Sequence, residues 1–476
     1  MAEILKPDIC VIGGGSGGLS VAAGASQMGA DVVLLERDKM GGDCLNYGCV
    51  PSKAAIAAGH AAQIMRTADR FGIANVVPSV DFQGVHDHIH GVIAGIAPHD
   101  SVERFEGLGV KVIQEEGRFT GPGEVTAGDT RIQAKKFVVS TGSSAGVPPI
   151  PGIEDVPYLT NETVFDLTEP PSHMIVVGGG PIGSELAQAH RRLGAEVTML
   201  EMFTILGKDD PEVTEVVKNR MAEEGIDLRE GIKIAKVAKD VDGVTVTLDK
   251  DGTEETVTGS HLLIAAGRNP NLDGLDLEAA GIDYERKGIK VDARLRTSNK
   301  RVFAIGDVAG GLQFTHAAGY HAGIIIRNIL FKMPAKVNYD AFPWVTYTDP
   351  EIAHVGQTEV QAAETHGKDI RILRFAFAEN DRAQAERETD GMIKVVTDKK
   401  GRILGCSMAG TRAGELILPW ALAISQKMKI GAMAGVVAPY PTLSEVSKRA
   451  AGSYYTPSLF SERTKKIVRF LLKLPF

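Results

Sequence analysis

Short apolar runs that end in glycine-rich turns alternate along the chain with longer segments of helical pattern. An apolar run over residues 9–12 precedes a small-residue helix that reaches about residue 28, and a second apolar run covers residues 31–35. The same order returns with a strand over residues 174–177, a helix, and a strand over residues 196–200. Continuous apolar strands that alternate with helices are typical of parallel sheets, so the pattern predicts an α/β fold.

A glycine-rich turn follows the first strand of each repeated unit. In a G-x-G-x-x-G turn the first glycine permits a tight bend, the second lets the backbone approach a pyrophosphate, and the third lets helix and strand pack closely. The free backbone N–H groups at the start of the following helix can donate hydrogen bonds to phosphate groups. The turns comprise Gly13, Gly15 and Gly18 in the first unit and Gly178, Gly180 and Gly183 in the second. Two units predict two bound dinucleotides.

An acidic residue closes each unit. Glu36 and Glu201 each lie 23 residues after the first glycine of their unit, where a carboxylate accepts hydrogen bonds from ribose hydroxyls. Glu201 would repel a 2′-phosphate, and the two residues after it supply no arginine, so the second unit favours NAD(H) over NADP(H). The alternative is that Arg191 or Arg192 reaches round to such a phosphate.

Beyond these units the pattern indicates further boundaries. A proline-rich stretch over residues 148–157 marks a domain boundary. The run over residues 263–271 predicts a strand with an exit turn, and residues 302–310 predict a buried strand that ends at Gly306-Asp307.

From about residue 339 the architecture changes. Alternating strands are predicted over residues 370–377 and 392–397, followed by a helix over residues 414–428. The predicted division is residues 1–150 together with 271–338, residues 151–270, residues 339–455, and a tail of residues 456–476.

Bulk properties narrow the choice of partners. A length of 476 residues suits about three domains. The net charge of −8 argues against nucleic acid as a partner. The sequence has no run of 18 or more apolar residues, and residues 1–7 lack the pattern of a secretory signal. We therefore expect a cytoplasmic protein.

Two of the four cysteines lie in the segment GGDCLNYGCVPSK. Four residues separate Cys44 from Cys49, so a disulfide can close if the loop curls at a helix start and brings the Cα atoms within about 7 Å. Pro51 suits the first turn of such a helix. A cysteine at a helix N-terminus, with Lys53 nearby, has a lowered pKa and reacts as the thiolate. The pair predicts a redox centre.

A structural disulfide and a zinc site are the alternative interpretations of this pair. Structural disulfides are rare without secretion, and zinc needs further Cys or His ligands at matching spacing, which the neighbouring sequence lacks. The other two cysteines, Cys10 and Cys406, lie in apolar strand-like runs and are interpreted as core residues.

Taken together, these motifs resemble the class I pyridine nucleotide-disulfide oxidoreductases, such as dihydrolipoamide dehydrogenase, glutathione reductase and mercuric reductase. The resemblance covers about residues 7–455 and implies two Rossmann-like nucleotide-binding domains plus a C-terminal α+β dimerisation domain. FAD would be bound by residues 1–150 and 271–338, NAD(H) by residues 151–270, and the chain would form a homodimer. Three further motifs carry the resemblance: Ser140-Thr141-Gly142, Ala266-Gly267-Arg268 and Ala304-Ile305-Gly306-Asp307.

The resemblance also implies roles for individual residues. Cys49 would face the flavin as the charge-transfer thiolate, and Cys44 would be the interchange thiol that meets the substrate. Lys53 would sit beside the flavin and pair with Glu185. Asp307 would hold the ribityl or phosphate region of FAD. The other implied cofactor-binding residues are Glu36, Thr141, Gly142, Glu201, Gly267, Arg268, Gly306, Thr315 and His316.

One position departs from the family pattern. The family carries a C-terminal His-Pro-x-x-x-x-Glu segment that acts on the cysteine pair of the partner subunit. Here Tyr440 stands in place of the histidine, and Glu445 is kept. A phenol ordinarily has a pKa of about 10, against about 6.5 for imidazole, so Tyr440 is a poor base. We expect weak activity toward dihydrolipoamide, because general-base catalysis is worth roughly 10²–10⁴-fold.

Three functions remain open. The first is an FAD-dependent NAD(H):disulfide oxidoreductase that passes electrons through the cysteine pair to a disulfide, a quinone or another acceptor. The second is a mercuric reductase-like enzyme. Tyr440 and the segments 380–383 and 413–416 resemble those of mercuric reductases, but no cysteine follows Cys406 to form the C-terminal pair that receives the ion in those enzymes. The third is a membrane-docked redox sensor or electron-transfer partner.

Two weaker patterns in the sequence, a histidine run and a basic amphipathic tail, also suggest binding sites. The run from His86 to His90 would place these two histidines on one helical face. Two ligands without a third favour a solvated helix face, so no metal is expected. In residues 456–476, Phe460, Ile467, Leu471 and Leu474 fall near one helical face with basic residues around them. Such a helix can lie on the inner face of a membrane, and packing on its own dimer is the alternative.

Overall fold

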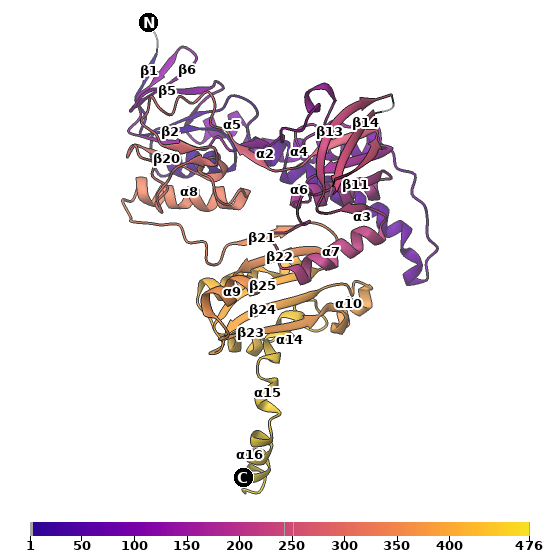
Figure 1. The fold of residues 1–476 in the computed structure, drawn as a ribbon. Helices are drawn as coiled ribbons and strands as arrows, with labels where there is room; N and C mark the ends of the chain where they lie inside the picture. The colour runs from indigo at the N-terminus through magenta and orange to yellow at the C-terminus, as the bar shows by residue number, and fades with distance from the viewer. Residues whose placement is uncertain (1–2, 242, 251, 476) are drawn as a thin grey trace.

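The computed structural model describes residues 3–241, 243–250 and 252–475. Met1 and Ala2, which begin the stretch predicted to lack a signal, and Phe476, which ends the predicted tail, lie outside the described residues. Figure 1 shows two sheet regions side by side, a third region beneath both, and a C-terminal tail that projects from the third.

A five-stranded parallel sheet organises the first region, in the order β20-β8-β2-β3-β4. Successive side chains of a strand point to opposite faces. Ile9 and Val11 pack against helices on one face, whereas Cys10 and Ile12 pack against a small sheet, β1-β7-β6-β5, on the other. The elements are β1 Ile4–Leu5, β2 Ile9–Ile12, α1 Ser16–Gln27, β3 Val32–Leu35, α2 Gly42–Asn46, α3 Cys49–Arg66, α4 Phe82–Ile96, α5 Val102–Gly107, β4 Val110–Ile113, β5 Gly117–Gly121, β6 Glu124–Ala127, β7 Thr130–Ile132, β8 Lys136–Val139, β18 Tyr284–Glu285, β19 Gly288–Ile289, β20 Val302–Ala304 and α8 Thr315–Ile329.

The second region repeats this architecture. A parallel sheet in the order β12-β11-β10-β16 packs helices α6 and α7 on one face and an antiparallel sheet, β13-β14-β15, on the other. Helix α3 belongs to the first stretch of chain, yet its Ala54 and Ala55 join the core around α6. The elements are β10 His173–Val177, α6 Pro181–Arg192, β11 Glu196–Leu200, α7 Pro211–Glu223, β12 Asp227–Arg229, β13 Lys233–Asp240, β14 Gly243–Lys250, β15 Thr253–Gly259 and β16 His261–Ile264.

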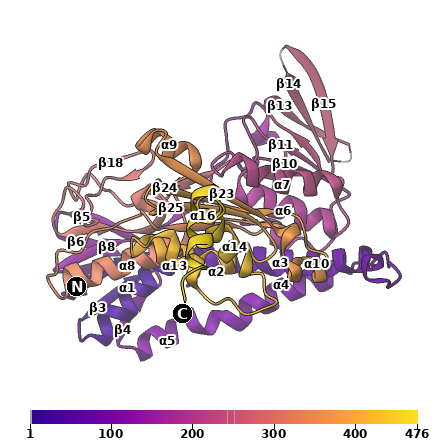
Figure 2. The ribbon, with the colours of Figure 1, turned by 90° about the horizontal axis from the view of Figure 1, so that it is seen from below.

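The third region is an antiparallel sheet in the order β21-β22-β25-β24-β23. Figure 2, seen from below, shows helices α13 and α14 across this sheet. The helix predicted over residues 414–428 is wrong in its continuity: it divides into α11 and α12, because Pro419 lacks an N–H and restarts the helix at its first turn. The elements are β21 Pro343–Thr346, β22 Glu351–Gly356, α9 Glu359–His366, β23 Ile370–Ala376, α10 Asp381–Glu386, β24 Met392–Asp398, β25 Ile403–Gly410, α11 Ala413–Leu416, α12 Leu418–Ser425, α13 Ile430–Gly435 and α14 Glu445–Ser453.

Two short strands join the first two regions. β9 (Ser143–Ala145) lies where the chain leaves the first sheet, and β17 (Arg268–Pro270) lies where it returns. The two strands pair antiparallel, with Arg268 opposite Ala145. This ribbon fixes the outgoing and returning segments side by side at the carboxyl ends of β8 and β16. In open α/β sheets ligands bind beyond the carboxyl ends of the strands.

Candidate active site

A cavity of about 2540 Å³ is lined by residues from all three regions. It takes in both glycine turns, both cysteines of the pair and the first turn of α8. A pocket for one small ligand usually measures about 300–1,000 Å³. The cavity is therefore large enough for more than one extended ligand.

Both glycine turns are held by close backbone approaches. Gly13 and Gly178 adopt φ values of +107° and +110°, which favour glycine. A Cβ added to Gly18 would lie 1.9 Å from the carbonyl oxygen of Gly13, and one added to Gly183 would lie 2.0 Å from that of Gly178. Packing of helix against strand therefore requires glycine at these positions.

The middle glycine of each turn has a different environment. A Cβ added to Gly180 would meet no protein atom within 4 Å, and one added to Gly15 would meet only the Cα of Gly42, at 3.9 Å. Both residues line the cavity directly before a helix N-terminus. Protein packing does not require glycine there, but close approach of a phosphate group does, so these turns fit the pyrophosphate of a dinucleotide.

The two acidic residues occupy equivalent positions. Glu36 accepts hydrogen bonds from the backbone N–H groups of Gly14, at 2.6 Å, and Asp38, at 2.8 Å. Glu201 accepts from those of Gly179, at 2.7 Å, and Phe203, at 2.8 Å. Each carboxylate is thereby held at the end of its second strand and beside its glycine turn.

The cysteine pair lies at the junction of two helices. Cys44 lies in α2 and Cys49 is the first residue of α3, so the predicted helix start is found at Cys49, with Pro51 in its first turn. Both are thiols in this structure. The Sγ of Cys49 lies 3.3 Å from the Oγ1 of Thr315, the first residue of α8. Cys10 and Cys406 are both fully buried in the core.

The two thiols differ in acidity. A hydrogen bond from Cys44, assisted by Thr315 and the positive charge of Lys53, lowers the pKa of Cys49 to about 6 against the opposing effect of burial. The same hydrogen bond to Cys49, together with burial, raises the pKa of Cys44. Removal of one proton from the pair therefore places the thiolate on Cys49.

Lys53 and Glu185 form an ion pair beside Cys49. The Nζ of Lys53 lies 2.7 Å from an oxygen of Glu185, and the carboxylate is almost fully buried. The second oxygen of Glu185 accepts from the backbone N–H of Tyr347 at 2.9 Å. The Nζ of Lys53 also lies over the Tyr347 ring, 4.2 Å from its centre. Residues of the second and third regions, Glu185 and Tyr347, therefore position an ammonium group of the first region.

Asp307 lies in a second polar cluster. It accepts from the Ser143 hydroxyl at 2.6 Å, and burial raises the pKa of its carboxyl. Arg268 donates to the same hydroxyl at 2.7 Å and forms an ion pair with Asp43 at 2.9 Å. The cluster links the ribbon of β9 and β17 to the first turn of α2.

The remaining predicted cofactor residues line the same cavity. Thr141 donates through its hydroxyl to the backbone oxygen of Asn271 at 2.8 Å. His316 lies 2.8 Å from the backbone oxygen of Pro343 through its Nε2 and stacks on Phe342. The cavity lining includes Thr141, Gly142, Gly267, Arg268, Gly306, Asp307, Thr315 and His316.

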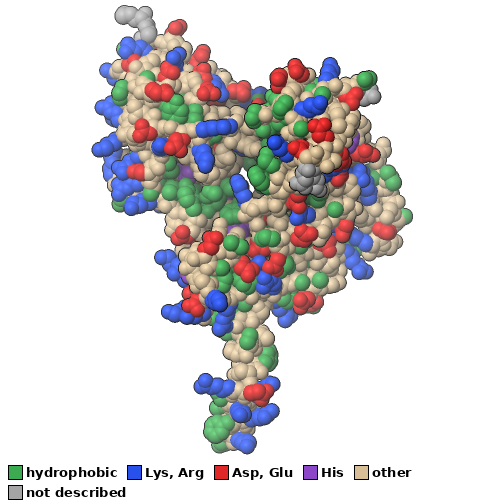
Figure 3. Space-filling model, viewed as in Figure 1, with side chains coloured by type: hydrophobic (Ala, Val, Ile, Leu, Met, Phe, Trp, Pro, Cys, Tyr) green, Lys and Arg blue, Asp and Glu red, His purple; other side chains and the backbone are tan. Residues whose placement is uncertain are grey.

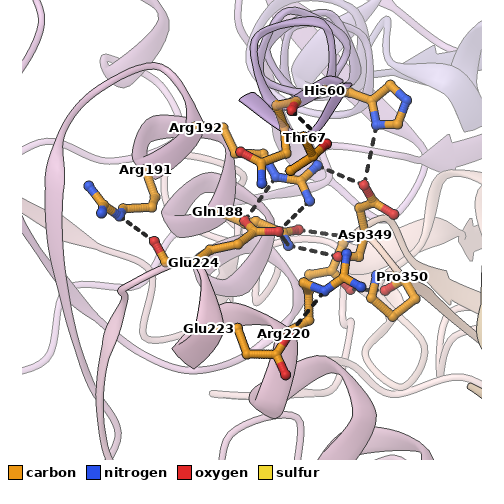
Figure 4. Close-up of polar contacts among 12 residues, drawn as sticks. His60, Thr67, Gln188, Arg191, Arg192, Arg220, Glu223, Glu224, Asp349 and Pro350 are labelled. Atoms are coloured by element: carbon orange, nitrogen blue, oxygen red, sulfur yellow. Dashed lines mark hydrogen bonds and ion pairs between the residues drawn. The ribbon is translucent and has the colours of Figure 1, made fainter. Parts of the chain in front are cut away.

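The two arginines next to the second unit have other partners. Figure 4 shows Arg191 and Arg192 at the C-terminal end of α6, among residues of α7 and the turn before β22. Arg192 is buried and forms ion pairs with Glu224 at 2.5 Å and Asp349 at 2.8 Å. Arg191 donates to the backbone oxygens of Glu224 and Ala195. Both guanidinium groups therefore bind partners that lie away from Glu201.

Tyr440 and Glu445 are not brought to the cysteine pair of their own chain. Tyr440 is 71% exposed, and its hydroxyl donates to Asp381 at 3.0 Å. That hydrogen bond and the charge of Asp381 raise the pKa of the phenol. Glu445 begins α14. Among the described residues, neither lines the cavity.

Several residues at the site were missed in the sequence. Tyr347, Ser143 and Asp43 contact predicted site residues; the first two belong to no motif, and Asp43 lies in the cysteine segment but was assigned no role. His321 accepts from the backbone N–H of Gly306 at 3.1 Å, and burial lowers its pKa to about 4, so the ring is neutral and able to accept. Only His321 offered a signal in the sequence, because it lies in the predicted helix that Thr315 begins; in the structure it is buried in α8.

The histidine run lies on α4. The rings of His86 and His90 lie 4.2 Å apart, and each is close to an aspartate, Asp87 and Asp166 respectively. Over residues 3–241, 243–250 and 252–475, no group of three or more His, Cys, Asp or Glu side chains is arranged to hold a metal ion.

Comparison with known proteins identifies the family. Residues 7–322 match the family model of the pyridine nucleotide-disulphide oxidoreductases, and residues 342–451 match the dimerisation domain of the same family. The chain belongs to this family, which confirms the resemblance in the motifs and the expected fold class. The family uses FAD and a pyridine nucleotide, and its dimerisation domain supports a homodimer.

Relatives of this chain carry different names. It is 34% identical over 446 residues to a mercuric reductase of Bacillus cereus, covering 93% of this chain and 70% of the relative. It is 36% identical to a dihydrolipoyl dehydrogenase of Halobacterium salinarum, covering 93% and 95%. A Cu(II) complex of the HOCl-induced flavoprotein disulfide reductase RclA from Escherichia coli superposes with a TM-score of 0.83 at 27% identity, covering 93% and 98%. The chain is thus an FAD-dependent oxidoreductase of this family.

None of the helices described in the structure is long and apolar enough to cross a membrane.

Proposed function

We propose that this enzyme takes electrons from NADH and delivers them, through FAD and the Cys44–Cys49 pair, to an acceptor at Cys44. The observation that carries the proposal is the position of the cysteine pair. It lines the same cavity as both glycine turns, and its more acidic thiol contacts the first residue of α8. In the half-reaction NADH and one proton are consumed, the S–S bond is broken, and NAD⁺ and two thiols result.

The chain's own residues prepare the sulfur atoms for this exchange. Bound FAD would supply a two-electron relay between nicotinamide and sulfur. Thr315 and Lys53 stabilise negative charge on Cys49, which leaves the proton on Cys44. Glu185 and Tyr347 keep the Lys53 ammonium in place. The open turns at Gly15 and Gly180 would hold the two pyrophosphates, and Asp307 would accept from a hydroxyl of the flavin side chain.

The nucleotide would be NAD(H) rather than NADP(H). Glu201 is held at the end of β11, where its charge opposes a 2′-phosphate, and Met202 and Phe203 beside it are exposed and uncharged. Arg191 and Arg192, the residues that would favour a phosphate, have partners at the opposite end of α6.

Tyr440 and Glu445 would act in the homodimer, each chain offering them to the partner's Cys44. The Tyr440 hydroxyl already donates to Asp381, so the segment offers a hydrogen-bond donor in place of a base. This favours acceptors that require no thiol deprotonation by the enzyme. A soft metal ion is therefore a second candidate acceptor, because thiolates are its preferred ligands.

The test is a steady-state assay of NADH oxidation with lipoamide, an aromatic disulfide, Hg(II) and a quinone as acceptors. We expect a yellow protein that gains two titratable thiols when NADH is added. A colourless protein, or one in which NADH releases no thiols, would refute the proposal. The variant Tyr440→His should raise lipoamide turnover by roughly 10²-fold and leave Hg(II) turnover unchanged.

A redox sensor or electron-transfer partner is the alternative reading of the same site. It predicts that NADH reduces the flavin and the cysteine pair but that none of the four acceptors sustains turnover. A cytoplasmic location belongs to either proposal, because both need NADH and reducible thiols. Peripheral contact of residues 456–476 with the inner face of the membrane is compatible with that location.

A further inference from the structure

The C-terminal tail stands apart from the body of the protein. Beyond α14 the chain forms α15 (Thr456–Leu459) and α16 (Glu462–Leu471), interrupted at Phe460. Figure 1 shows both helices below the third region. None of their residues is buried. Within the described chain, every hydrogen bond of residues 459–475 is made to the tail itself or to Tyr455.

Helix α16 has two chemically distinct sides. At 3.6 residues per turn, the apolar residues at i, i+3, i+4 and i+7 fall within a sector of roughly 100°. They are exposed to between 48% and 63%. This apolar stripe consists of Ile467, Phe470 and Leu471 of α16 and Leu474 in the turn that follows it. The opposite side carries Lys465, Lys466 and Arg469 of α16 and Lys473 in the same turn.

The charge of the tail opposes that of the body. Residues 456–476 contain five basic residues and one acidic residue, a net charge of +4, while the whole chain carries −8, which leaves −12 for residues 1–455. Among the described ion pairs, the tail forms only the one between Lys465 and Glu462. Figure 3 shows the basic side chains gathered around the projecting tail. Among the described ion pairs the tail's other four basic residues take no part, so four cations are available to a negatively charged surface: Arg463, Lys466, Arg469 and Lys473.

The tail lies outside the residues that match the dimerisation domain. The family model of that domain ends at residue 451, five residues before α15 begins. A helix with an apolar stripe, flanked by lysine and arginine and containing phenylalanine, has the pattern of one that lies in a membrane interface. Cations on the flanks reach phosphate groups while their stems cover apolar surface.

We propose that residues 456–476 dock this enzyme on a membrane surface rich in anionic lipid. The apolar stripe of α16 enters the boundary between headgroups and acyl chains, and the four cations bind headgroup phosphates. The acidic body stays in the aqueous phase, because an anionic surface repels it. The proposal concerns the tail alone and does not depend on the electron acceptor.

Co-sedimentation with vesicles tests the proposal on the purified holoenzyme. The full chain should pellet with mixed phosphatidylcholine–phosphatidylglycerol vesicles and remain in solution with phosphatidylcholine alone. Each basic residue near an anionic surface strengthens binding about fivefold. The variant Lys466→Gln, Arg469→Gln, Lys473→Gln should therefore lower the partition coefficient about 100-fold, and added salt should act in the same direction.

Two matched variants separate charge from folding. Removal of three body lysines, Lys287→Gln, Lys300→Gln and Lys400→Gln, changes the net charge equally and should leave binding intact. Replacement of Ile467 and Leu471 by serine should weaken binding while keeping every cation. A chain ending at Tyr455 should keep its NADH oxidation in solution and its dimeric mass.

Three results would overturn the proposal. The first is equal pelleting of the full and shortened chains. The second is equal binding to neutral and anionic vesicles. The third is a shortened chain that becomes monomeric while the full chain stays off every vesicle, which would assign the tail to the dimer interface.

Discussion

The two nucleotide-binding units share one backbone design and differ in what surrounds it. An added Cβ at Gly18 or Gly183 would meet backbone at 1.9 Å or 2.0 Å, and Glu36 and Glu201 each accept from two backbone N–H groups at equivalent positions. The first unit opens toward the cysteine pair and α8. The second ends at exposed Met202 and Phe203. The repeated backbone therefore provides phosphate binding in both units, and the residues around each turn determine which dinucleotide binds there.

The largest effect is expected from alanine at the third glycine of each turn. Gly18→Ala and Gly183→Ala each force a Cβ against a carbonyl oxygen, which should destabilise the unit by about 3 kcal/mol or more. We expect Gly18→Ala to be purified with little flavin, measured by absorbance, and Gly183→Ala to keep flavin but to be reduced slowly by NADH. Gly91→Ala in α4, where an added Cβ meets nothing within 4 Å, is the matched control. Equal flavin loss in both variants would contradict the assignment of FAD to the first turn and NADH to the second.

Replacement of a sulfur atom should separate the two half-reactions. In Cys49→Ser the nucleotide-binding turns are intact, so NADH should still reduce the flavin in stopped-flow measurements. Turnover with any disulfide should fall by roughly 10⁴-fold or more, as when a reacting group is removed. Cys406→Ala removes a buried thiol outside the cavity and should retain turnover. Disulfide reduction by Cys49→Ser at the wild-type rate would show that electrons leave by another route.

Replacement of Glu36 or Glu201 should affect the binding of a different nucleotide in each case. Glu201→Ala should lower kcat/KM for NADH by about tenfold, since a charge-assisted hydrogen bond is lost, and should leave that for NADPH level or improved. The same change at Glu36 should weaken retention of FAD without altering the preference between nucleotides. An equal fall for NADH and NADPH in Glu201→Ala would mean that the carboxylate does not contact the 2′-position.

The smallest predicted effect concerns the acidity of Cys49. With its pKa lowered to about 6, the thiolate predominates above that pH and is lost as the pH falls through it, so alkylation of the reduced enzyme by iodoacetamide should slow below pH 6. Thr315→Val removes one donor to the sulfur and should raise the midpoint by less than about one unit. Gly319, one turn along α8, allows Gly319→Ala as a control, because an added Cβ there meets nothing within 4 Å. A midpoint near that of a free thiol in the wild-type enzyme would contradict the assignment.

Elements set by local pattern were predicted well. The strand expected over residues 196–200 is β11, and the two turns have the backbone geometry that their glycines require. The prediction failed where a single residue opposes the structure that its neighbours favour. The helix over residues 414–428 breaks at Ile417, two residues before Pro419, since a missing N–H outweighs the apolar periodicity on either side.

The two dinucleotide units and the reactive pair could be predicted from the sequence, because each depends on glycines, an acid or cysteines at short fixed spacings. The distant side chains that complete these sites depend on how the three regions pack together. The contact of Ser143 with Asp307 joins residues 164 apart, and that of Lys53 with Glu185, which only the family resemblance implied, joins residues 132 apart. Such contacts arise when separate sheets pack together, and no local spacing encodes the direction in which Arg191, Arg192 or Tyr347 points.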